Sequence, residues 1–214
     1  KLFYVHMTDY CFLDLETTGF EPNKDSIIEV SFVRYIDGKL VSEMDQVCIP
    51  DKSELSDFVS NLTGITQSEI DAEGVLFASL AAEVSEKIGD SVIVGHNIDF
   101  DINFLIANGV TVENNPRFDT HELARILLIK EESYALEVLS QKYEFIHESA
   151  HRAMSDVIAS KDLFELLLSK VVELPTQFLK QIRPILQTKT SWHAKDLFLN
   201  AEGIENHSAT TQER

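Results

Sequence analysis

Cysteine is scarce in this chain: only Cys11 and Cys48 occur among its 214 residues, each within an apolar stretch. Two thiols are too few for a disulfide framework, and no group of cysteines and histidines has the spacing of a zinc site. We expect both thiols to be free and buried, as is typical of a reducing compartment. Their scarcity favours a cytoplasmic protein and excludes the disulfide-rich secreted classes.

Long hydrophobic runs are also missing. No apolar stretch approaches the roughly 18 residues that a membrane-spanning helix needs, so no membrane partner is expected. Residues 1–7 are too short for a signal peptide and lack an initiating Met, which is compatible with a fragment of a longer protein. With 44% hydrophobic and 25% charged residues, the composition is that of an ordinary globular domain.

Positive charge is in short supply, since 18 Lys and Arg face 36 Asp and Glu and leave a net charge of −18. The whole excess lies before residue 171, because the residues after it carry equal numbers of both signs. Nonspecific tracking along nucleic acid needs a basic surface, so such binding is not expected. A small acidic pocket can still take an anionic substrate if bound metal ions supply the positive charge.

The pattern of apolar runs and turn residues predicts a mixed α/β domain. The Asp37-Gly38 pair is a strong signal for a tight hairpin between two strands, and Thr66 to Glu69 has the sequence of a helix-capping box. The expected strands are 10–15, 26–36, 39–49 and 91–94. The expected helices are 75–88, 100–108, 120–129, 134–143 and 153–171. Antiparallel strands followed by helices indicate a central mixed sheet flanked by helices.

The chain divides into an N-terminal extension, a main domain and a C-terminal extension, at residues 1–8, 9–171 and 172–214. The last segment is expected to be partly helical. Its first helix, at 176–186, should be interrupted at Pro184, and a shorter one should follow at 192–199. Residues 202–214 are polar without a hydrophobic pattern, so flexibility is expected there.

The first strand carries two acids inside an apolar run. Side chains alternate along a strand, so Asp14 and Glu16 share one face while Leu13 and Leu15 occupy the other. Two carboxylates side by side on an otherwise buried strand repel each other and lose hydration. A divalent metal ion is the obvious compensating charge, which points toward metal-assisted phosphate chemistry.

Two later segments add acids where the chain enters a helix. Residues 96–105, HNIDFDINFL, follow a buried strand. Asp99 is well placed as a helix N-cap, which leaves Asp101 as the better metal ligand. The second segment, HRAMSD, opens the last long helix. Five helical residues would turn His151 and Asp156 about 140° apart, so both can serve one site only if His151 precedes the helix.

Together these motifs resemble the DEDDh family of 3′→5′ exonucleases, which includes the bacterial replicative proofreading subunit. The resemblance covers about residues 9–170 and is carried by DLETTG, HN-x-x-FD-x-x-FL and HRA-x-x-D. Three shorter segments between these motifs also resemble the family in order and spacing: LTGIT, DT and Y-x-L-x-x-L. The resemblance implies an RNase H-like fold. It also implies four metal carboxylates and a general base, which are Asp14, Glu16, Asp101, Asp156 and His151.

The implied chemistry is hydrolysis of the 3′-terminal phosphodiester of single-stranded or frayed DNA, which releases 5′-mononucleotides in proofreading or repair. Two divalent ions about 4 Å apart would clamp the attacking water and the leaving oxygen. Hard oxygen ligands suit Mg²⁺ or Mn²⁺, with Asp14 as the bridging ligand. A histidine, with an ordinary pKa of about 6.5, suits deprotonation of the water.

Five further residues are candidates for binding the substrate. Thr17, Thr18 and Gly19 form a turn that could hold the terminal 3′-OH, although an ordinary turn after a strand remains an alternative. Phe20 could wedge against the terminal base, or simply pack. Asn97 could orient the strand, or make a loop hydrogen bond.

Other residues of interest are expected to be structural. His96 is expected to have a structural role, and His121 and His147 are expected at the surface because they have no motif partner. Trp192 is expected to anchor the C-terminal extension in a groove.

Two alternative functions stay open. The first is a 3′→5′ exoribonuclease of the same family. The second is a non-catalytic module that binds nucleic acid or a polymerase. Loss of one of the acids or of His151 would have favoured this alternative. With no basic track, the isolated domain should release its strand often and take its processivity from a polymerase or a fused domain.

Overall fold

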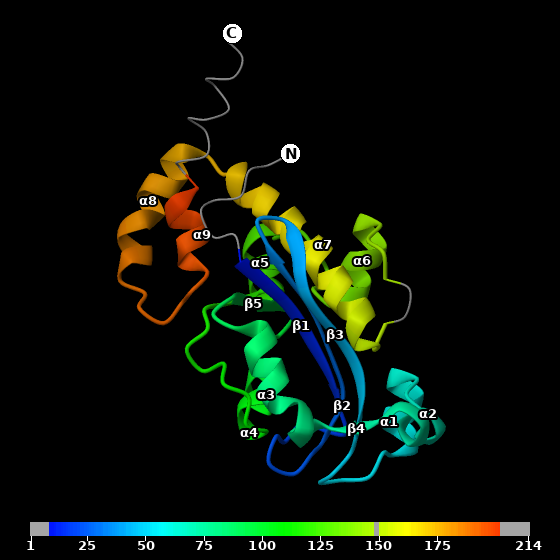
Figure 1. Ribbon diagram of the computed structural model, residues 1–214. Coiled ribbons are helices and arrows are strands. Elements are labelled where there is room, and N and C mark those ends of the chain that lie inside the picture. Colours follow the sequence, from blue (N-terminus) through cyan, green and yellow to red (C-terminus); the bar gives the residue numbers. More distant parts are fainter. Residues whose placement is uncertain (1–8, 148–149, 202–214) are drawn as a thin grey trace.

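A six-stranded sheet forms the centre of the protein in a computed structural model, which describes residues 9–147 and 150–201. The strand order is β4-β3-β2-β1-β5-β6, with β1 antiparallel to β2 and parallel to β5 (Figure 1). The strands are Asp9–Thr17 (β1), Ile27–Ile36 (β2), Lys39–Ile49 (β3), Val75–Leu76 (β4), Val92–Gly95 (β5) and Arg117–Asp119 (β6). This mixed sheet with its helices confirms the predicted fold class. The predictions for residues 1–8 and 202–214 lie outside the described residues.

Helices cover both faces of the sheet (Figure 1). Helices α3 and α4 pack on one face, and α5 and α7 pack on the other, while α1 and α2 enclose a small third cluster near the end of β3. The helices are Asp57–Thr63 (α1), Gln67–Glu73 (α2), Phe77–Ile88 (α3), Asp99–Ala107 (α4), Thr120–Leu127 (α5), Leu136–Tyr143 (α6), Ala153–Val172 (α7), Thr176–Gln187 (α8) and Lys195–Asn200 (α9). Among the described residues, no helix is both long and apolar enough to cross a membrane.

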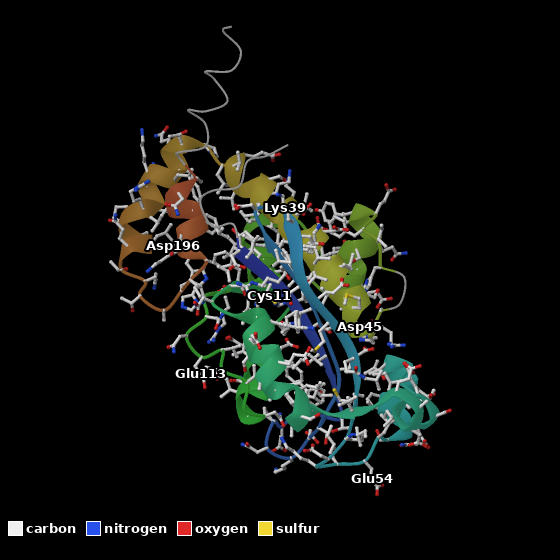
Figure 2. All side chains as sticks on the ribbon, viewed as in Figure 1. Cys11, Lys39, Asp45, Glu54, Glu113 and Asp196 are labelled. Carbon is white, nitrogen blue, oxygen red and sulfur yellow. The ribbon has the colours of Figure 1, made fainter. Side chains whose placement is uncertain are left out.

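Strand β1 contributes to both cores because its side chains alternate. Tyr10 and Phe12 belong to the cluster beneath α5 and α7, whereas Cys11 belongs to the cluster beneath α3 and α4. Figure 2 labels Cys11 at the middle of the sheet, and both cysteines are free and buried as predicted. Asp14 and Glu16 have the parity of Tyr10 and Phe12, so the strand directs both acids to the α7 side.

The parallel partner of β1 ends before β1 does. Strand β5 pairs with β1 only from Tyr10↔Val92 to Phe12↔Val94. At Gly95 the chain passes so close to β1 that a Cβ atom would lie 2.8 Å from the Leu13 carbonyl oxygen. Only glycine fits such an approach. Beyond this point one edge of β1 is free to bond to side chains.

The start of α3 differs from the prediction. The predicted helix at 75–88 is wrong in its first two residues, because Val75 and Leu76 pair with Cys48 and Ile49 as strand β4. A two-residue strand leaves no periodic signal in the sequence. The predicted helix start at Thr66 is confirmed, since the Thr66 side chain accepts a hydrogen bond from the Glu69 backbone N–H.

The C-terminal helices pack on the α7 side of the sheet. Buried side chains from α8 and α9 join the same hydrophobic cluster as α7. Pro184 does not interrupt α8, contrary to the prediction. It is exposed, so water can solvate the carbonyl that its missing N–H leaves unpaired. Trp192 anchors the segment before α9 as predicted, stacking on Phe198 and donating its indole N–H to Glu122 at 2.7 Å.

Candidate active site

The free part of β1 opens into a cleft of about 940 Å³. Its wall brings together residues from β1, from the first turn of α4, from the segment before α7 and from α7 itself. These include all five residues predicted to be catalytic, which are Asp14, Glu16, Asp101, His151 and Asp156.

Asp101 is fixed by the free edge of β1. The residue is 3% exposed, and its Oδ1 accepts a hydrogen bond of 3.0 Å from the Leu15 backbone N–H. That donor is available because β5 has already left the sheet. The predicted N-cap role of Asp99 is wrong: Ile98 is the N-cap residue of α4, and Asp99 instead forms an ion pair with Arg117 at 2.7 Å.

His151 lies before α7, in the position that a shared site with Asp156 requires. Helix α7 begins at Ala153, and His151 has a backbone φ of 64°, which is uncommon for a residue other than glycine. One side-chain ligand atom each from Glu16, His151 and Asp156 lie within 4.8 Å of one another. The three residues can therefore act on the same ion or water molecule.

A buried ion pair holds the segment that carries His151. Glu29 is 1% exposed and lies opposite Glu16 in the β1–β2 register. Its Oε1 accepts from Arg152 Nη2 at 2.7 Å, and its Oε2 accepts from the Ala153 backbone N–H at 2.8 Å. Glu29 thus caps α7 from the sheet, because the N-cap residue of that helix makes no side-chain cap bond of its own. Arg152 also pairs with Glu69 of α2 at 3.1 Å.

His147 was predicted at the surface, and that prediction is wrong. Its side chain is 7% exposed, and its Nε2 lies 2.5 Å from Oδ1 of Asp156. The residue follows α6 in an irregular segment, so no helical or strand spacing linked it to Asp156. The cleft thus contains a second histidine in direct contact with a predicted metal carboxylate.

The acids of the cleft hold their protons more tightly than isolated carboxyl groups do. Burial, together with the charges of Asp101 and Asp156, raises the pKa of Asp14 well above its ordinary value. Burial and Asp156 raise the pKa of Glu16 to about 8. Burial likewise raises the pKa of Asp101 and of Asp156, although the bond from His147 opposes the shift at Asp156. A hard divalent cation would relieve this repulsion, so the donor set fits such an ion.

The metal-free protein should lose stability as the pH rises from about 4.5 to about 8. The folded-state pKa of Glu16 is about 8, above the ordinary value of 4.5, so the folded protein retains a proton that the unfolded chain has released. Stability then falls with rising pH across this interval. Urea denaturation in EDTA across the interval would measure it, and Glu16→Gln should flatten the dependence. A wild-type stability that increases over the same interval would contradict the electrostatic account.

The predicted substrate-binding residues divide into two groups. Phe20 and Asn97 line the cleft; Phe20 is 87% exposed, and Asn97 has a φ of 64°. The turn at Thr17, Thr18 and Gly19 is held by its own bonds. The Thr17 hydroxyl donates to the Gly19 carbonyl at 2.6 Å, and the Thr18 hydroxyl accepts from a backbone N–H at 2.8 Å. Those two hydroxyls are therefore occupied in shaping the turn.

Two more histidines line the cleft side by side. His96 is partly buried and bonded to Thr120 at 2.9 Å, and burial lowers its pKa to about 4. Its ring meets that of His121 edge to face at 5.2 Å, and His121 also contacts the ring of Tyr134. His121 is thus a partly buried residue of the cleft wall, and its ring partners were not predicted. The neutral His96 fits its predicted structural role.

The chain that forms this cleft is similar to known exonucleases. The family model described as Exonuclease matches residues 11–164. The chain is 34% identical over 195 residues to the 3′-5′ exonuclease DinG of Bacillus subtilis, covering 88% of this chain and 21% of that protein. It is 32% identical over 211 residues to the PolC-type DNA polymerase III of Latilactobacillus sakei, covering 89% and 14% respectively. The chain therefore spans about a fifth or less of the length of these curated relatives.

The fold is also that of a solved nuclease. The zinc-bound form of the Escherichia coli exonuclease I complex with single-stranded DNA superposes with a TM-score of 0.67 at 23% sequence identity. The match covers 83% of this chain and 44% of that chain.

Proposed function

Because this chain belongs to the exonuclease family, we propose that it is a metal-dependent 3′→5′ exonuclease that releases 5′-mononucleotides from single-stranded or frayed DNA. One observation carries the proposal: four acids and a histidine from separate parts of the chain meet in one cleft at the free edge of β1. The names of the relatives, a 3′-5′ exonuclease and a DNA polymerase, support both the direction and the choice of DNA.

The carboxylates of Asp14, Glu16, Asp101 and Asp156 would hold two divalent ions, Mg²⁺ or Mn²⁺, because such ions prefer oxygen ligands. Bound there, the ions would offset the negative charge that develops on the phosphate during hydrolysis. Asp14 is the acid suited to a shared position, since, besides burial, the charge of each of the other three acids raises its pKa.

His151 is assigned the role of general base. Its position outside the helix, close to Glu16 and Asp156, lets it take the proton of a water held at those acids. The water oxygen bonds to the terminal phosphorus as the bond from phosphorus to the 3′-oxygen of the preceding nucleotide breaks. That oxygen leaves with the shortened strand and gains a proton. The terminal nucleotide departs with its 5′-phosphate.

Around the terminal nucleotide, Phe20 is proposed as a wedge against the last base and Asn97 as a guide for the strand. The exposed ring of Phe20 leans edge to face on Phe100 at 6.4 Å, which supports it from behind. The turn at Thr17–Gly19 is proposed to receive the 3′-OH.

The two histidines beside Asp156 should separate in kinetics. His151→Gln is expected to lower kcat on single-stranded DNA by about 10²–10⁴, because the water loses its base. His147→Gln should lower the rate less, because His147 acts by positioning Asp156. Single-turnover rates of both variants on the same strand would measure the two losses. A larger loss in His147→Gln than in His151→Gln would overturn the assignment.

One experiment tests the function against both alternatives. End-labelled single-stranded DNA and RNA of identical sequence are incubated with the protein in Mg²⁺, Mn²⁺ or EDTA, and the products are separated. Metal-dependent release of mononucleotides from DNA in preference to RNA supports the proposal. Preference for RNA supports an exoribonuclease, and binding without release from either supports a non-catalytic module.

The place of the domain in a larger assembly is also proposed. Because its relatives are several times longer, we infer that it works beside a polymerase or another fused domain that keeps the strand close. The net charge of −18 supports this division of labour, since the domain alone should release its strand often. Two buried free thiols support a cytoplasmic location.

A further inference from the structure

A second cavity adjoins the cleft and has no role in the chemistry described above. It measures about 690 Å³ and lies between α5, β6 and the segment that precedes α9. His121 and Arg125 line both the cleft and this cavity. The two spaces are therefore neighbours along one surface, with these two side chains at their junction.

The acids of the second cavity are already compensated within the fold. Asp99 pairs with Arg117 at 2.7 Å. Asp119 accepts from two backbone N–H groups of the first turn of α5, at 2.8 and 3.3 Å, and from that of Asn97 at 3.1 Å. Glu122 accepts from the indole N–H of Trp192. Their negative charges are thus partly offset before any ligand arrives.

Arg125 differs from all of these groups. It is exposed near the end of α5 and makes no hydrogen bond or ion pair with any residue that the structure describes. Among the described residues that line the active-site cleft, it is also the only lysine or arginine. An uncommitted guanidinium beside a phosphate-cleaving cleft has the geometry and the permanent charge to bind a backbone phosphate.

Apolar surface for a nucleobase is present in the same cavity. Trp192 lines it and is braced from behind by its stacking on Phe198, with ring centroids 5.6 Å apart. Ile126, 43% exposed, lines it as well. Aromatic side chains bind bases of single strands by stacking, without regard to sequence.

We propose that the second cavity binds the part of the substrate strand upstream of the cleaved nucleotide. Arg125 contacts a backbone phosphate where the strand leaves the cleft, and the Trp192 surface accepts a following base. The inference rests on the proposed function. It gives this acidic domain a local contact for a single strand that the overall charge would not predict.

Arg125→Gln and substrate length test the proposal. For the full chain, Arg125→Gln should raise KM for an eight-nucleotide single strand by about three- to tenfold and leave the dinucleotide unaffected. The slope of log Kd against log salt, measured by anisotropy with the labelled eight-nucleotide strand, should fall in magnitude by about 0.7, as expected for one lost phosphate contact. Trp192→Phe should weaken binding of the longer strand less than Arg125→Gln, because it keeps a ring for stacking.

Lys130→Gln is the matched control, since Lys130 is an exposed cation in the turn that follows α5 and lines neither cavity. Equal effects of Arg125→Gln and Lys130→Gln, or an equal effect of Arg125→Gln on short and long strands, would overturn the proposal. Anisotropy detects binding of the strand whether or not the protein cleaves it. A wild-type protein that binds but does not cleave would therefore count against the proposed function alone.

Discussion

Asp14→Asn is expected to abolish exonuclease activity and at the same time to stabilise the metal-free protein. Asp14 lies among the acids of the cleft, where burial and the neighbouring charges raise its pKa. Asparagine has the same shape but no charge, so it removes the repulsion and also the carboxylate that is proposed to hold the metal ions. We expect the rate on single-stranded DNA to fall by at least about 10³, and the melting temperature in EDTA to rise by a few degrees.

The loss of activity and the rise in melting temperature must occur together for the electrostatic account to hold. Thermal unfolding in EDTA and in Mg²⁺ measures the melting temperature, and the Mg²⁺-induced increase in it should shrink in the variant. Asp90→Asn is a suitable control, because Asp90 is an exposed acid in the turn before β5. It lies at the start of that strand, whereas Gly95 and the cleft lie at its other end. Near wild-type turnover in Asp14→Asn would rule out this acid as a metal ligand.

The parts of the fold that were predicted correctly depend on patterns among neighbouring residues of the sequence. The hairpin between β2 and β3 follows from Asp37 and Gly38, which adopt φ angles of 52° and 73°, as a tight turn between twisted strands requires. The acids of β1 follow from the two-residue period of a strand, and Asp101 and Asp156 from the motifs that carry the family resemblance. Each of these inferences needs only a few neighbouring residues.

The parts that were missed depend on contacts between distant segments. Glu29 and Arg152 are 123 residues apart in the chain, and in sequence Glu29 is one acid within an apolar strand. The contact of His147 with Asp156 arises from an irregular segment without periodicity. Asp99 has the sequence of an N-cap but pairs with Arg117, a residue of β6 in a separate part of the chain. Tertiary packing decides such cases, and local pattern does not record it.

Arg152→Met is expected to have the largest effect on stability. It leaves Glu29, whose side chain is 2% exposed, without its guanidinium partner and directly opposite Glu16. Removing one partner of a buried ion pair costs about 3–5 kcal/mol. We expect about 3 kcal/mol, because the Arg152 side chain is itself 36% exposed and solvent screens part of the interaction. Urea denaturation with an unchanged m-value would measure the loss.

A double-mutant cycle separates the ion pair from simple packing. Glu29→Gln keeps an oxygen that can accept from the Ala153 N–H, and Arg152 keeps Glu69, so this change alone should cost less than Arg152→Met. In Glu29→Gln/Arg152→Met no unpaired buried charge remains, and stability should recover toward that of Glu29→Gln. Strictly additive losses would mean that the two residues act independently. The ion pair holds the segment next to His151, so kcat should decrease across the variants in the same order as stability. A packing defect alone would leave kcat unchanged.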